Sequence, residues 1–98
     1  MQFPTDHHKK LFSVILSLNN ESAARDFLRD LMTIGELDAL AERWHIARLL
    51  WTTNLSYKEI AKKTKASTTT VTRVSHWLNH GMGGYHAVLI RLFGSRKT

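Results

Sequence analysis

A group of hydrogen-bonding side chains lies in the second half of the chain, on one face of an expected helix. Thr68, Thr69, Thr72 and Arg73 include pairs that are three and four residues apart. Side chains of these types at helical spacing can reach base edges and phosphates in the major groove of DNA. Threonine lowers helix propensity, so a run of three at a helix start is locally unfavourable. A binding role explains this choice better than helix stability does.

Lysines precede this face in the sequence. Lys58 and Lys62 fall on a short helix just before it, and Lys63 and Lys65 lie nearby. We expect Lys58 and Lys62 to neutralise phosphates beside an inserted helix, with Arg73 also close to the phosphates. An ordinary helical hairpin with solvated threonines is the structural alternative.

The charge is unevenly distributed along the 98 residues. Residues 1–55 carry six Lys and Arg against seven Asp and Glu, whereas residues 56–98 carry eight Lys and Arg against Glu59 alone. The net charge of +6 therefore originates in the second half. Such a region attracts a polyanion such as nucleic acid, although a basic surface can also serve solubility alone.

Other chemistries find little support in the sequence. His76 and His80 have the i,i+4 spacing of metal-binding pairs, but no third ligand is evident and we predict no metal site. The chain has no cysteine, and it shows no nucleophile–base pair, phosphate-binding glycine loop or paired catalytic carboxylates. We predict that the protein is not an enzyme.

The elements that must position these residues are six helices, which make the predicted class all-α. Apolar residues recur at helical spacing, and Thr33 with Glu36 and Ser56 with Glu59 match capping boxes. Gly81 is expected to end the fifth helix. The predicted ranges are about 5–18, 22–32, 33–52, 57–64, 67–80 and 84–93, followed by a frayed basic tail at 95–98.

The fourth and fifth helices are joined by a two-residue turn, which predicts a helix-turn-helix over about 56–80. Lys65 departs from the glycine that usually supplies a positive φ at this turn, so we expect a strained or differently shaped turn. The apolar residues expected to pack the two helices together are Ile60, Ala61, Ala66, Val71 and Val74.

Length and hydropathy place the helices in one domain, residues 1–98. No apolar run approaches the roughly 20 residues needed to cross a bilayer. We therefore expect no membrane partner and a soluble, cytoplasmic protein. A domain this short gains considerable stability from a partner subunit, so we expect it to dimerise.

Five short motifs lie within residues 28–78, about half of the chain: LMT at 31–33, E-x-x-AL at 36–40, R-x-x-I at 43–46, LS-x-KE-IA at 55–61 and T-x-TVTR at 68–73. On these motifs, this part of the chain resembles the Trp repressor family. The resemblance implies an intertwined homodimer with a six-helix Trp-repressor-like fold, whose dimer core is formed by about 5–52 and 84–93. It also implies a transcriptional regulator, expected to be a repressor, which binds double-stranded DNA at a near-palindromic operator.

The resemblance further implies a corepressor pocket in which two arginines clamp L-tryptophan. The matching residues are Arg43 and Arg73, with Thr33 as a further pocket residue. Val74 replaces a family glycine and Trp77 replaces a family serine, and both are larger. We hypothesise that Trp77 or Val74 occupies the corepressor space, so that DNA binding is constitutive or depends on another small effector. Salt bridges or phosphate contacts are the alternative roles of the arginines.

Two other functions remain open on sequence grounds. The helical core could recruit another protein, with the basic half incidental, or the chain could bind nucleic acid without sequence preference. Trp44 and Trp51 continue the apolar stripe of the third helix, and we interpret them as dimer-core packing rather than a base-stacking platform.

Overall fold

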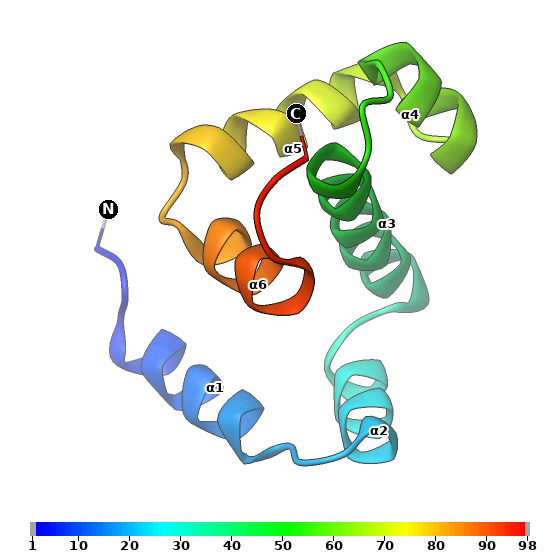
Figure 1. The fold of residues 1–98 in the computed structure, drawn as a ribbon. Coiled ribbons are helices and arrows are strands. Elements are labelled where there is room, and N and C mark those ends of the chain that lie inside the picture. Colours follow the sequence, from blue (N-terminus) through cyan, green and yellow to red (C-terminus); the bar gives the residue numbers. More distant parts are fainter. Residues whose placement is uncertain (1, 98) are drawn as a thin grey trace. The chain divides into compact units, whose positions relative to one another are not determined.

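A computed structural model describes residues 2–97, and these form six helices without a strand (Figure 1). The predicted all-α class is therefore confirmed, and the helix bounds agree with the prediction to about one residue. The helices are α1 (Asp6–Ser17), α2 (Glu21–Leu31), α3 (Ile34–Thr52), α4 (Tyr57–Thr64), α5 (Thr68–His80) and α6 (Gly84–Phe93).

The chain divides into two compact units, residues 1–37 and 38–98. In the first unit, Asn20 caps α2 by accepting from the Ala23 N–H at 2.8 Å. The predicted Thr33–Glu36 capping box is present, because the Glu36 N–H donates to Thr33 Oγ1 at 3.1 Å and the Thr33 N–H donates to Glu36 Oε1 at 2.9 Å. Neither α1 nor α2 contains a buried residue, and Leu16 is 86% exposed.

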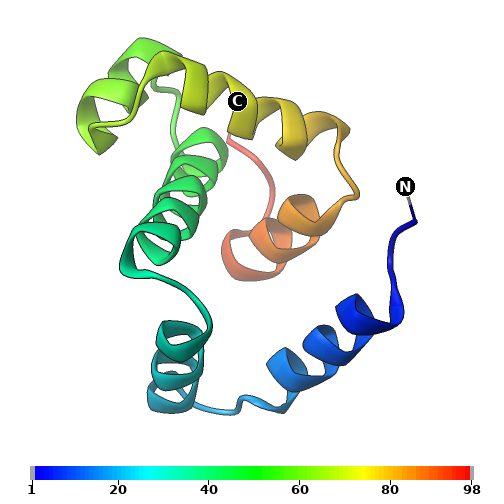
Figure 2. The same cartoon turned by 180° about the vertical axis from the view of Figure 1, so that it is seen from behind.

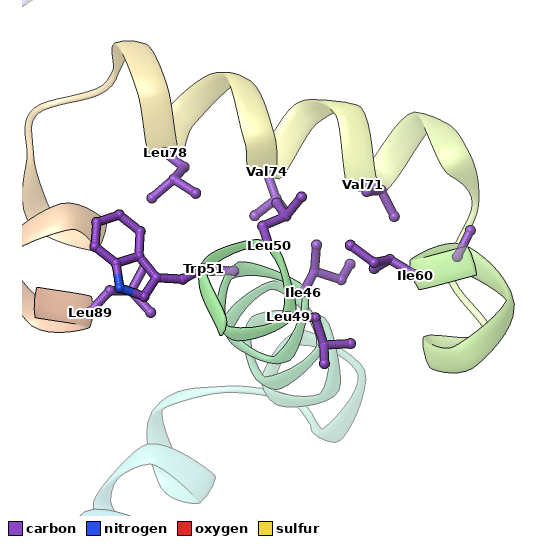
Figure 3. Packing of buried hydrophobic residues seen from close by; sticks show 11 residues of the cluster. Ile46, Leu49, Leu50, Trp51, Ile60, Val71, Val74, Leu78 and Leu89 are labelled. Atoms are coloured by element: carbon purple, nitrogen blue, oxygen red, sulfur yellow. The ribbon is translucent and has the colours of Figure 1, made fainter. Parts of the chain in front are cut away.

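The second unit contains the apolar core (Figure 3). The C-terminal part of α3 packs against α4, α5 and α6, and both cartoon views show α5 running across the end of α3 with α6 next to both (Figures 1 and 2). The helix-turn-helix packing predicted from the sequence is confirmed, since its apolar residues are buried or partly buried in this core. The core residues are Ile46, Ala47, Leu49, Leu50, Trp51, Ile60, Ala61, Val71, Val74, Leu78 and Leu89, with Ala66 packed against them.

Trp51 belongs to the core of a single chain rather than to a dimer core. Its side chain is 2% exposed, and its indole Nε1–H donates to the carbonyl oxygen of Gly94 at 2.8 Å. Trp44 is partly buried beside the core, with its ring 6.5 Å from that of Phe93. Both tryptophans thus have packing roles, and the placement of Trp51 corrects the expectation from the sequence.

The C-terminal tail contacts the end of α3 up to Lys97, whereas the sequence predicted a frayed end. The Lys97 N–H donates to the Trp51 carbonyl oxygen at 2.9 Å, and Arg96 is partly buried. These are contacts between segments far apart in the sequence, which helical periodicity cannot reveal. Thr98 lies outside the described residues.

No helix formed by residues 2–97 combines the length and apolar character needed to cross a membrane.

Candidate nucleic-acid interface

The first helix of the helix-turn-helix is fixed at its start by Ser56 and Glu59. The Glu59 N–H donates to Ser56 Oγ at 3.1 Å, and the Ser56 N–H donates to Glu59 Oε1 at 2.8 Å. The bond from the Ser56 backbone N–H lowers the pKa of the Glu59 carboxyl below its usual 4.5, and the Ser56 hydroxyl adds to the effect. The capping box therefore holds α4 most firmly when Glu59 is ionised.

The turn between α4 and α5 has the tight geometry usual for glycine even though it contains Lys65. Lys65 adopts φ 63° and ψ 16°, in the left-handed region. A residue with a Cβ pays roughly 1 kcal/mol or more in this conformation. The strain expected from the sequence is therefore located at Lys65, which adopts the conformation that a glycine would take at this position. Ser67 then caps α5 by accepting from the Thr70 N–H at 3.1 Å.

One exposed face of α5 brings together four of the predicted DNA-contacting residues. A shallow groove of about 450 Å³ on this face is lined by Thr68, Thr69, Thr72, Arg73 and His76. Thr72 Oγ1 donates to the Thr68 carbonyl oxygen at 2.9 Å, which leaves its lone pairs and methyl group for a partner. The face offers hydroxyls, a guanidinium and an imidazole to a polar ligand.

His76 also belongs to this face, although the sequence predicted neither a metal site nor a DNA-contacting role for it. Its position four residues after Thr72 and three after Arg73 was the signal that could have identified it. Its ring centroid lies 5.2 Å from that of His80. Among residues 2–97 no three His, Cys, Asp or Glu side chains gather where they could hold a metal ion.

Lys58 and Lys62 lie apart from the groove residues. Both are exposed on α4, one helical turn from each other. They extend the basic surface of the helix-turn-helix from α5 to α4, and their assignment as phosphate contacts stays a prediction.

A second groove, of about 490 Å³, runs between α3, α5 and α6. It brings together Arg43, Arg73, Val74 and Trp77 of the pocket implied by the family resemblance. Neither guanidinium forms an ion pair with a carboxylate of the described chain. The lining residues are Ala39, Glu42, Arg43, Thr70, Arg73, Val74, Trp77 and Tyr85.

The two departures from the family pattern both lie in the wall of this groove. Val74 is also part of the apolar core, whereas the Trp77 side chain is 57% exposed. Thr33 is not among the residues that line the groove, and in its own unit it caps α3. Its assignment as a pocket residue stays a prediction.

Glu42 and Tyr85 also line this groove, and neither was predicted from the sequence as a pocket residue. Burial raises the pKa of the Tyr85 hydroxyl, and the nearby Arg43 opposes this by lowering it. Glu42 is next to Arg43 in the sequence, so its place in the groove could have been predicted. Tyr85 belongs to α6, and only the tertiary fold places it beside Arg43. The groove thus combines two cations and one carboxylate with aromatic walls.

Comparison with known proteins identifies the family to which the chain belongs. The family model described as Trp repressor protein matches residues 6–93. The uncharacterized protein YerC of Bacillus subtilis is 41% identical over 83 residues, which span 85% of this chain and 79% of YerC.

Two solved structures share the fold. One is a TrpR-like protein from Eubacterium eligens, with 40% identity, a TM-score of 0.85 and 96% of each chain covered. The other is a Trp-repressor-type protein from Staphylococcus aureus, with 29% identity, a TM-score of 0.86 and coverage of 95% of this chain and 92% of that one. The chain, with its helix-turn-helix and its six-helix fold, belongs to the Trp repressor family.

Proposed function

We propose that this protein is a sequence-specific DNA-binding transcriptional regulator that acts as a repressor by occupying a promoter. The observation that carries the proposal is the exposed face of α5, where Thr68, Thr69, Thr72 and Arg73 line one groove on a helix held by a tight, capped turn. A helix presented in this way fits the major groove of B-DNA. Membership of a regulator family supports the same conclusion.

In this proposal, the threonines and the basic side chains contact different parts of the DNA. The threonine hydroxyls and methyl groups of α5 contact base edges, and Arg73 lies nearer the phosphates. Lys58 and Lys62 contact phosphates from α4. Base contacts then determine which sequence is bound, while the lysines supply affinity that depends on salt.

The working form is a homodimer. α1 and α2 contain no buried residue, and apolar side chains on them stay exposed, among them Phe12, Ile15 and Leu16. Isolated helices of 12 and 11 residues are marginal in water, so a second copy that covers them would stabilise both chains. Two copies would present two α5 helices to major grooves about 34 Å apart, which requires a near-palindromic operator.

The groove between Arg43 and Arg73 is the proposed effector site. Its volume of about 490 Å³ falls within the range of small-molecule pockets. Two guanidiniums favour a carboxylate or another planar anion. The Val74 and Trp77 side chains restrict the space for a bound indole, so we expect DNA binding to be independent of L-tryptophan, with a different small effector as the alternative.

The experiment that tests this function is the selection of bound genomic fragments by the purified protein, with and without millimolar L-tryptophan. A palindromic motif enriched in both arms supports a tryptophan-independent regulator. A motif enriched only with tryptophan restores the corepressor mechanism and refutes the argument from Val74 and Trp77.

Selection without any enriched motif contradicts the proposal and leaves the two rival functions. Competition by unrelated DNA separates them, because a nonspecific nucleic-acid binder is displaced by any sequence and an interaction module does not bind DNA at all.

A further inference from the structure

The C-terminal tail, residues 94–97, is fastened to the end of α3 at two points on Trp51. The indole Nε1–H donates to the Gly94 carbonyl oxygen, and the Lys97 N–H donates to the Trp51 carbonyl oxygen. Arg96 lies between these anchors, with its guanidinium carbon 5.8 Å from the centre of the Trp51 ring. Because Trp51 is buried in the core, the tail holds Arg96 in a defined position.

From this position the Arg96 side chain reaches α5. Arg96 Nη1 donates to Asn79 Oδ1 at 3.0 Å, and Asn79 Nδ2 donates to Ser75 Oγ at 3.4 Å. Ser75 Oγ is also hydrogen-bonded to the Tyr57 hydroxyl at the start of α4. Ser75 is only 4% exposed, so the hydroxyl in the middle of this relay is shielded from water. The side chains form a continuous connection from the tail through α5 to α4.

These hydrogen bonds constrain α5 in a way that its apolar contacts do not. Val71, Val74 and Leu78 attach the helix to the core through contacts that have little directional preference. A hydrogen bond weakens steeply when its distance or angle changes. Ser75 and Asn79 are one turn apart on α5, so bonds to both resist rotation of the helix about its axis. Any such rotation would also turn the groove of threonines away from its partner.

We propose that Arg96 and Asn79 are positioning residues that set the orientation of the DNA-contacting face of α5 without touching DNA themselves. This inference rests on the proposed function, because the orientation matters only if α5 contacts DNA. The relay ends at Arg96, so the C-terminal tail contributes to DNA recognition by holding α5 in position.

The first test compares Arg96→Ala with Lys97→Ala on a DNA fragment that the wild-type protein selects. Lys97→Ala is the matched control, since it removes the same charge from the same tail and keeps the backbone bond to Trp51. Arg96→Ala is expected to weaken binding about three- to tenfold, the range that one net hydrogen bond supports. The slope of log affinity against log salt should equal that of Lys97→Ala, and Arg96→Lys, which keeps a donor, should recover part of the loss.

Two results of this test would overturn the proposal. A salt slope that becomes shallower by about one for Arg96→Ala alone would make Arg96 a direct phosphate contact. Equal affinities for Arg96→Ala and Lys97→Ala would show that the relay does not influence DNA binding.

The second test needs no DNA and measures amide hydrogen exchange by NMR. Arg96→Ala should speed the exchange of the last-turn amides of α5 more than that of α3, and it should add nothing in an Asn79→Ala background. Uniform acceleration in all helices would indicate only a general loss of stability and would refute the positioning role. If the wild-type protein selects no DNA, the proposed function fails, and this exchange experiment still decides whether the relay orients α5.

Discussion

Lys58 and Lys62 carry a positive charge that can neutralise a DNA phosphate, whereas the threonines of α5 are uncharged. A lysine that contacts a phosphate releases a condensed counterion, whatever the neighbouring base sequence is. We therefore predict that Lys58→Ala weakens binding to all DNA sequences and lowers the salt slope by about one. Affinity measured at several salt concentrations on a selected and an unrelated fragment checks this, with Lys10→Ala on α1 as the control. An effect confined to the selected fragment and insensitive to salt would disprove the phosphate contact.

The carboxyl of Glu59 links the stability of α4 to pH. Its pKa in the folded protein is lowered below 4.5 by the hydrogen bond from the Ser56 backbone, so its contribution is fully present above the unfolded pKa and is lost as the pH falls through the folded pKa. We predict that the wild-type protein is more thermostable than Glu59→Gln at pH 7 and that this difference shrinks below about pH 4.5.

Thermal unfolding of both proteins from pH 7 to pH 3 measures this difference. Glu36, whose pKa is also lowered, is present in both proteins and cancels in the comparison. A wild-type advantage that stays constant down to pH 3 would rule out the ionised capping box as its source.

At the scale of the helices, Gly81 follows the last residue of α5. A glycine is needed there because a side chain would collide with Trp77, and not because φ is positive. A Cβ added at Gly81 would lie 2.5 Å from the Trp77 carbonyl oxygen and 3.1 Å from Trp77 Cε3, whereas one at Gly84 would meet no atom of the described chain within 4 Å. We predict that Gly81→Ala lowers the free energy of unfolding by about 1–3 kcal/mol, because backbone atoms must move. Gly84→Ala should leave it unchanged or raise it by up to about 1 kcal/mol. Urea denaturation of the two variants checks the contrast, and equal effects would contradict it.

The helices themselves could be predicted from the sequence because their determinants are local. Capping boxes such as Ser56 with Glu59 and apolar residues at helical spacing fix where each helix begins and which side it buries. The groove-lining side of α5 could be predicted from the same periodicity, which missed only His76.

Features that depend on tertiary contacts could not be predicted in this way. Tyr85 enters the groove beside Arg43 from another helix, and Arg96 bonds to Asn79 across 17 positions of sequence. Nothing in the spacing of these residues indicates that they meet. Lys65 is an intermediate case, since the sequence indicated a strained turn and the structure supplied its φ of 63°.

For the whole molecule, the proposed dimer accounts for the apolar residues that a single chain leaves exposed. We predict that Ile15→Glu shifts the protein from dimer to monomer and weakens DNA binding, because a charge would have to be buried in the interface. Ser13→Glu is the matched control, since it introduces the same charge on the same helix about 200° away around its axis. Sedimentation velocity at several concentrations measures the assembly. A wild-type protein that stays monomeric at all concentrations would refute the dimer, and equal behaviour of the two variants would exclude Ile15 from its interface.

The three tryptophans occupy three different environments, and this gives the protein an intrinsic fluorescent probe. Trp51 is buried in the core, Trp44 is partly covered, and Trp77 is largely open to water in the wall of the groove that contains Arg43 and Arg73. An indole in water emits at longer wavelength than a buried one. A molecule that covers Trp77 should therefore shift the red edge of the emission spectrum and leave the blue contribution of Trp51 constant, so the groove can be screened for ligands without any attached dye.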